Sequence, residues 1–134
     1  QAGARLCVGV DSHACENAFE EVRAVELDER SRLEARHTAA EAPALLDAAT
    51  RLGYEACGWS NDWRDDRVHL NAHDPSIASI DSTHVPDAIL FGATPRAVNK
   101  VILGDKKIVE GGYHVQYEEA LEGYRTATRK LDLI

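Results

Sequence analysis

The sequence is short of several features that would define its class. Its 134 residues include no methionine, and no apolar run approaches the roughly 20 residues that span a bilayer. The first residues also lack the basic and apolar regions of a secretion signal. We therefore expect a soluble, cytoplasmic protein with no membrane partner. Because the chain opens on Gln1 and has no methionine, we expect it to be a piece of a larger fold.

Cysteine is also scarce, and the three cysteines are Cys7, Cys15 and Cys57. An odd number of cysteines without Cys-x-x-Cys spacing indicates neither a disulfide framework nor a cysteine-based zinc site. Free cysteine behaves mainly as a small hydrophobic residue. We expect reduced, mostly buried thiols.

Basic residues are outnumbered, with 15 Lys and Arg against 23 Asp and Glu, and the net charge is -8. This balance disfavours nonspecific binding to nucleic acid or to anionic membranes, which requires a basic surface. The length and the 44% hydrophobic content suit one ordinary domain with a moderate core. A small molecule or another protein segment is the expected partner.

The most informative segment is Arg5-Leu-Cys-Val-Gly-Val-Asp-Ser-His13. It reads as a strand that ends in a carboxylate and an imidazole, and chemistry collects at the carboxyl ends of strands in α/β folds. Asp11 is therefore the leading catalytic candidate. The alternative is that Asp11 only caps a turn or a helix through its short side chain.

Two helices are predicted after this strand. Apolar periodicity indicates the first from Asn17 to about Arg36, with Asn17 and Glu20 at capping-box spacing. The second runs from near Thr38 or Glu41 to Leu52, and Gly53 is its predicted stop. Residues 59–86 are polar and read as loop, with one short strand at 67–70.

The C-terminal part carries a hairpin pattern and a further helix. Gly104-Asp105 separates the apolar runs 98–103 and 106–109, and a two-residue loop of this type supplies the positive φ of tight hairpin turns. Residues 117–131 form the predicted helix. One face, expected to be buried, comprises Ala120, Leu121, Tyr124, Ala127 and Leu131.

Val8 to His13, followed by Phe19-Glu-Glu-Val-Arg-Ala-Val-Glu-Leu-Asp-Glu-Arg30, resembles the end of the catalytic barrel in formimidoylglutamate deiminases of the amidohydrolase superfamily. The resemblance continues through residues 53–59, 89–91 and 98–114. It implies an α/β fold. The chain would comprise the C-terminal portion of a metal-dependent hydrolase TIM barrel (last strand and helices) and part of a small β-sandwich. The implied divisions are 1–58 for the barrel strand and helices, 59–87 for a loop-rich connection, 88–114 for the sandwich remnant and 115–134 for a C-terminal helix.

By this resemblance, Asp11 is a metal ligand, usually to zinc, and a proton carrier, while Ser12 and His13 lie near the substrate or support Asp11. Family members bind their metal largely through an early His-x-His pair and later histidines, and this chain contains no His-x-His. The segment 60–70 also lacks the family's glycines. We therefore expect the isolated chain to be catalytically incomplete and to need a missing N-terminal barrel portion.

Other polar groups have simpler interpretations. The charges Glu20, Glu21, Arg23, Glu26 and Arg30 are spaced for structural ion pairs along one helix. His69 and His73 are four residues apart, but the sequence around them suits a helix poorly and no zincin-type glutamate is present. Packing is the expected role of Trp59 and Trp63. Surface positions or hydrogen bonds are expected for His37, His84 and His114.

The function implied is metal-dependent hydrolysis of a C–N bond, with formiminoglutamate giving formylglutamate and ammonia in histidine degradation, by a homo-oligomeric enzyme acting on a small-molecule substrate. One alternative is another deaminase or cyclic-amide hydrolase of the same superfamily. The alternative from another class is a non-catalytic, acidic α/β interaction module that uses no metal.

Overall fold

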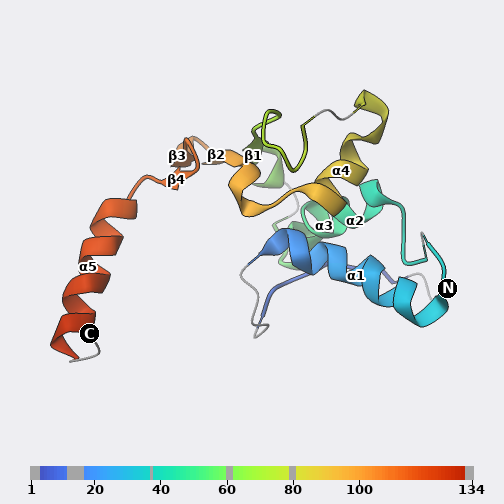
Figure 1. Cartoon of the computed structure of the whole chain (residues 1–134), viewed down its shortest axis with the longest axis horizontal. Helices are drawn as coiled ribbons and strands as arrows, with labels where there is room; N and C mark the ends of the chain where they lie inside the picture. Colours follow the sequence, from blue (N-terminus) through green and yellow to red (C-terminus); the bar gives the residue numbers. More distant parts are fainter. Residues whose placement is uncertain (1–3, 12–16, 37, 60–61, 79–80, 132–134) are drawn as a thin grey trace.

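The computed structural model describes residues 4–11, 17–36, 38–59, 62–78 and 81–131. Helices precede the first strand of a small sheet, a further helix lies between the first and second strands, and a last helix follows the sheet (Figure 1). The α-helices and strands are α1 (Ala18–Leu33), α2 (Ala42–Ala48), α3 (Arg51–Ala56), β1 (Arg67–Leu70), α4 (Val85–Gly92), β2 (Val98–Leu103), β3 (Lys106–Glu110), β4 (Tyr113–His114) and α5 (Tyr117–Lys130). Three short 3-10 turns are η1 (Asp62–Arg64), η2 (Ser82–His84) and η3 (Pro95–Ala97).

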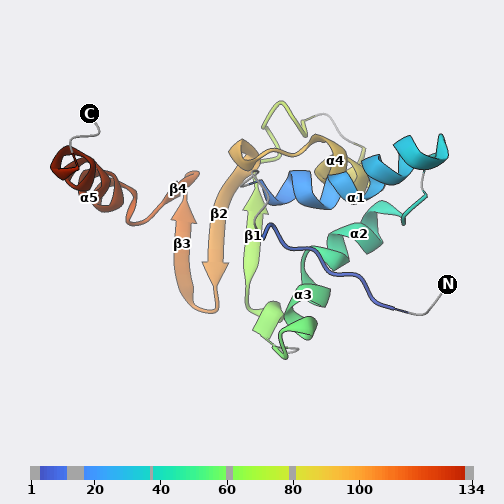
Figure 2. The same cartoon turned by 90° about the horizontal axis from the view of Figure 1, so that it is seen from below.

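The core lies where α1, α2 and α4 pack together (Figure 2). Its buried residues are Val22, Ala42, Leu45 and Leu90. Leu45 and Leu90 are almost completely shielded from solvent, and each contributes about 1.5–3 kcal/mol through burial. Sequence analysis missed α4, which lies partly in the segment read as loop. No helix in the described part of the chain has the length and apolar character that a membrane crossing requires.

Helix α1 confirms the predicted start and ends slightly early. The side chain of Asn17 accepts a hydrogen bond from the Phe19 amide at 3.0 Å, as an N-cap residue does. The helix ends at Leu33, and Glu34 turns the chain with a φ of 49°.

The predicted second helix is wrong as a single element, because the chain breaks between α2 and α3. Thr50 leaves the helical region with φ -129° and ψ -100°, and its hydroxyl donates to the Leu46 carbonyl at 2.8 Å. A β-branched residue is a weak helix former, so a break costs little there. Gly53 lies inside α3 and does not end a helix.

The segment 5–10 was predicted to be a strand, and the structure corrects this prediction. It is extended chain that runs beside α2 and α3 (Figure 2), attached by a hydrogen bond from the Val8 amide to the Ala48 carbonyl at 3.3 Å. A strand is defined by pairing with a neighbour, and the sheet of the described residues is β1–β4 only. The barrel strand is therefore not seen in this structure.

The predicted burial of the thiols is also wrong for two of the three cysteines. Cys7 and Cys57 are exposed and free, whereas Cys15 lies outside the described residues. Cys7 lies in the extended segment, which pairs with no strand among the described residues.

The sheet confirms the predicted hairpin and the short strand at 67–70. Its four strands are antiparallel in the order β1-β2-β3-β4. Gly104 has a φ of 58°, so the Gly-Asp loop supplies the left-handed residue that the turn requires.

Helix α5 confirms the predicted span but contradicts the predicted burial of its apolar face. Tyr124 and Leu131 are 65% and 67% exposed, Ala120 and Ala127 are exposed, and Leu121 is half-buried. Periodicity identifies an apolar face without identifying what covers it. No described element packs extensively along this face.

Candidate functional site

Asp11 lies in a turn at the end of the extended segment that passes α2 and is exposed to solvent. Its φ of 45° is in the left-handed region, where aspartate is one of the few non-glycine residues found regularly. The backbone thus turns sharply at the residue that carries the leading catalytic carboxylate. Ser12 and His13, the other two predicted site residues, lie outside the described residues.

The charged run on α1 joins this helix to its neighbours. The guanidinium of Arg23 donates to two carbonyls at the end of α4, Leu90 and Ala93, each at 2.9 Å. These carbonyls lie at a helix C-terminus, where backbone acceptors lack helical partners. Arg23 therefore fixes α4 against α1.

Glu26 is completely buried in the same run. Its carboxylate accepts hydrogen bonds from the amides of Thr38 and Ala39, at 3.2 and 3.0 Å, and from Arg30 Nε at 2.8 Å. The Arg30 guanidinium lies 4.6 Å from the centroid of the Phe91 ring, which is within cation-π range. The predicted ion pairing is confirmed for Glu26 and Arg30, whereas Arg23 binds backbone carbonyls rather than a carboxylate.

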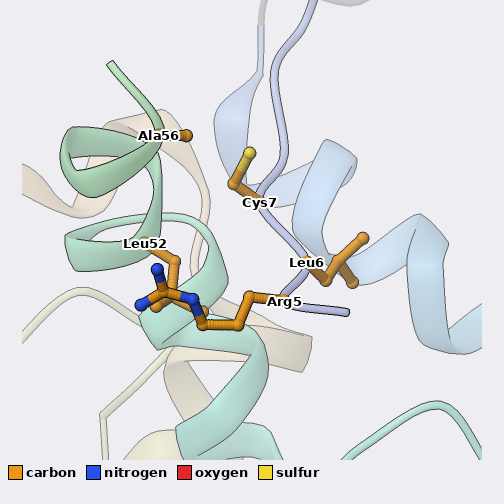
Figure 3. A pocket seen from close by; sticks show the side chains of 5 residues that line it. All are labelled: Arg5, Leu6, Cys7, Leu52 and Ala56. Carbon is orange, nitrogen blue, oxygen red and sulfur yellow. The ribbon is translucent and has the colours of Figure 1, made fainter. Parts of the chain in front are cut away.

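A small cavity of about 190 Å³ lies between the N-terminal segment and α3 (Figure 3). It is lined by Arg5, Leu6, Cys7, Leu52 and Ala56. Ligand sites are usually about 300–1,000 Å³, so this volume is small for a substrate. The Arg5 guanidinium pairs with Glu55, which ties the segment to α3.

A larger cavity of about 410 Å³ lies between α3 and the edge of the sheet, with mostly apolar walls. Its polar centre is Asp66, which sequence reasoning missed. Asp66 accepts from the Tyr54 hydroxyl and, at 2.7 Å, from the Gly104 amide. Tyr54 also makes an edge-to-face contact with Trp59 at 6.4 Å between centroids. Trp59 is nevertheless 58% exposed, so the packing role expected of it is seen only in part. Asp66 thus joins α3 to the hairpin turn.

A second aspartate that the sequence did not reveal is Asp74, which is 6% exposed. It accepts from the Ser76 hydroxyl at 2.7 Å, from the Ser76 amide at 2.9 Å and from Arg96 Nε at 2.9 Å. These hydrogen bonds, led by that from the Ser76 hydroxyl, lower the pKa of Asp74 to about 2. The Asp-Pro-Ser sequence is a local turn pattern that could have indicated the first two contacts.

The histidines do not form a metal site among the described residues. His69 is exposed on β1 opposite Lys100, and His73 is exposed in the following turn. His114 accepts a hydrogen bond from the Gln116 amide at 3.1 Å, in line with the hydrogen-bonded role expected for it. Across the described ranges, no group of three or more His, Cys, Asp or Glu side chains could hold a metal ion.

Comparisons with known proteins relate this arrangement to one superfamily. No family model matches the chain. A formimidoylglutamate deiminase of Pseudomonas aeruginosa is 28% identical in an alignment 133 residues long, gaps included, that covers 91% of this chain and 29% of that protein. The crystal structure of an amidohydrolase from Brucella melitensis superposes with a TM-score of 0.79 at 27% identity, over 96% of this chain and 30% of that chain. The chain resembles part of an amidohydrolase.

This amidohydrolase resemblance confirms what residues 8–30 and the closing hairpin indicated. The chain spans about 30% of the length of the relatives it matches. The described residues form a group of packed helices and a small antiparallel sheet. In the sequence, Asp11 precedes α1.

Proposed function

We propose that the chain is the C-terminal portion of an enzyme that hydrolyses the C–N bond of a formimino group, converting formiminoglutamate to formylglutamate and ammonia. The main support is similarity to a deiminase by sequence and to an amidohydrolase by structure, over nearly all of the chain. The run from Glu20 to Arg30 adds to this support, because three of its residues each make a specific contact. Arg23 binds the end of α4, Glu26 binds the amide of Thr38, and Arg30 lies over the Phe91 ring. The alternative superfamily substrates are cyclic amides and aminated heterocycles.

In this proposal, Asp11 carries the proton that the reaction must move. Water adds its oxygen to the formimino carbon, which forms a C–O bond and gives a tetrahedral intermediate. A carboxylate accepts one proton of the water and delivers it to the nitrogen that departs, and the second proton of the water follows as the hydroxyl becomes the carbonyl, so the C–N bond breaks and ammonia leaves. Asp11 is suited to such transfer because it is accessible to solvent and lies on a sharp turn.

A divalent metal, most often zinc, is the cofactor that the superfamily resemblance implies. The described residues do not fit such an ion by themselves, since a catalytic zinc needs about three protein ligands and only Asp11 is proposed here. Asp11 would be this chain's contribution to the centre, and the other ligands would come from outside the described residues. Ser12 and His13 are proposed to lie close to the substrate or to orient Asp11.

The test is expression of the complete reading frame that encodes this chain, with ammonia release measured from formiminoglutamate, guanine and imidazolonepropionate. We expect formiminoglutamate to be preferred. Asp11→Asn should lower kcat by about 10²–10⁴-fold, the usual value of a positioned acid–base group. Asp28→Asn, which removes the same charge from an exposed position on α1, should leave kcat unchanged.

Two results would contradict the proposal. Preference for another substrate would replace the formimino reaction by one of the alternatives. Strong turnover of formiminoglutamate by the 134-residue chain alone, assayed with zinc, would show that no ligand from outside the chain is required.

A further inference from the structure

Helix α5 carries an exposed apolar stripe with the spacing of a helix–helix seam. Tyr117, Leu121, Tyr124 and Leu131 are separated by four, three and seven residues, which places them on one face of the helix. Tyr117 is 44% exposed, and Tyr124 and Leu131 are exposed further. In both views α5 projects away from the other helices and the sheet (Figures 1 and 2). Tyr117 makes an edge-to-face contact with the Tyr113 ring, 5.6 Å between centroids, and Thr128 on the same face is buried. Tyr124 and Leu131 are left exposed, and α5 packs extensively against no other element of the described chain.

The solvent-accessible surface of the chain is larger than that of a compact monomer, which indicates that a partner covers part of it. The chain exposes 9898 Å². A compact monomer of 14.7 kDa exposes about 6,900 Å² by the usual scaling of surface with mass. The difference, about 3,000 Å², exceeds the roughly 800 Å² per partner of a standard protein interface. Because the chain spans about 30% of the length of its relatives, this area alone does not distinguish a second copy from the rest of the enzyme, and the charges of α5 make that distinction.

The charges of α5 are divided between its two halves. The first half carries Glu118, Glu119 and Glu122, and the second half carries Arg125, Arg129 and Lys130. A second α5 laid antiparallel would bring each acidic half beside a basic half, whereas a parallel one would bring like charges together. Antiparallel pairing also opposes the two helix dipoles. This pattern matches a second copy of the same helix.

We propose that α5 is a self-association surface, on which a second copy of this chain packs its own α5 antiparallel about a two-fold axis. Leu121 then faces Tyr124 of the second copy at the centre of the seam. Glu118 flanks the seam and faces Arg125 of the second copy, and the two-fold axis repeats this ion pair. Arg125 is available for it, because its contact with Glu122 within the chain is 4.0 Å long.

The same register brings Leu131 of the second copy to the hollow at the base of α5. The register that pairs positions 121 and 124 places Leu131 of the second copy just beyond Tyr117, the first residue of α5. An open hollow of about 650 Å³ lies there, lined from Tyr113 to Glu119. Val115 is 58% exposed beside it and gives the leucine an apolar contact. On the other side of the seam, Ala120 faces Ala127 of the second copy, and these small side chains permit close approach of the helices.

Sedimentation equilibrium of the 134-residue chain tests the proposal. We expect a monomer–dimer equilibrium over about 5–200 µM, because a 14-residue helix gives a short seam. Glu118→Arg and Arg125→Glu should each raise the dissociation constant about tenfold, since each replaces two attractions per dimer by two repulsions. The double variant should return to within about threefold of the unmodified chain, because it restores both pairs with reversed sign.

Glu119→Arg is the matched control, because it makes the same charge change in the same helical turn but points away from the seam. It should leave the dissociation constant unchanged. Far-UV circular dichroism of each variant checks that α5 is retained, and rescue in the double variant excludes loss of the helix as the cause. The proposal is overturned if the chain stays monomeric throughout, in which case another part of the enzyme covers the stripe. Equal effects of Glu118→Arg and Glu119→Arg, or no rescue, also overturn it.

Discussion

The buried carboxylate of Glu26 lies 2.8 Å from Arg30 Nε and also receives the backbone amides of Thr38 and Ala39. A residue on α1 therefore stabilises the conformation of the connection to α2. Glu26 is completely buried, so its carboxylate takes the place of the water that these two amides would otherwise bind.

Replacing Glu26 by alanine should lower the free energy of unfolding by about 3 kcal/mol, because it leaves two amides and a partly buried guanidinium without their acceptor. Glu26→Gln keeps one acceptor oxygen and should cost about half as much. Urea unfolding followed by circular dichroism measures both changes. The control is Glu29→Gln, which removes the charge of a half-buried glutamate paired with the exposed Arg32 at the helix surface and should have little effect. Equal losses at positions 26 and 29 would contradict this role.

The parts of the fold that sequence analysis predicted are those determined locally. The Asn17 cap fixes the start of α1, and the Gly104-Asp105 loop fixes the hairpin, because a short stretch of chain contains all the atoms involved. The break at Thr50 was not predicted, since it accompanies a contact between Val8 and Ala48, residues far apart in the sequence.

The candidate site was predictable only in part, for the same reason. The pattern of the first segment selects Asp11, but the ligands that would accompany it are not encoded near it. Asp66 and Asp74 have partners 12 to 38 residues away, and no periodicity reveals such pairs. The run on α1 was recognisable, but its partners on α4 were not, because α4 itself was read partly as loop.

Gly92 should tolerate no side chain, because a Cβ there would lie 2.5 Å from the carbonyl oxygen of Ser76. Gly92→Ala forces backbone to move and should cost about 1–3 kcal/mol, the usual cost of overpacking. Gly53→Ala is the control, since a Cβ at Gly53 has open space inside α3, and alanine should stabilise the helix by about 0.5–1 kcal/mol. Thermal unfolding distinguishes the two variants, because the melting temperature should fall for Gly92→Ala and rise for Gly53→Ala. A stabilising effect of Gly92→Ala would show that the contact between α4 and residues 76–77 has room for a methyl group.

Tyr54→Phe should lower the free energy of unfolding by about 1 kcal/mol, because it removes the hydroxyl that donates to Asp66. It should also speed hydrogen exchange at the Gly104 amide, which binds the other carboxylate oxygen of Asp66. Tyr124→Phe removes a hydroxyl from a largely exposed ring on α5 and should change neither quantity. Unchanged exchange at Gly104 in Tyr54→Phe would mean that Asp66 does not couple α3 to the hairpin turn.

Asp74 should make stability depend on pH in the acid range. Hydrogen bonds from Ser76 and Arg96 lower its pKa from 3.8 to about 2 in the folded chain. A depressed folded pKa means that the unfolded chain binds a proton first, so the stabilisation is complete above about pH 5 and is lost as the pH falls through 4 towards 2. The gap in unfolding free energy between the unmodified chain and Asp74→Asn should therefore be largest at pH 6 and shrink at pH 3. Urea titrations at both pH values, with Asp28→Asn as the exposed control, measure it. A gap of the same size at both pH values would show that the Asp74 carboxylate is not held in its charged form by these hydrogen bonds.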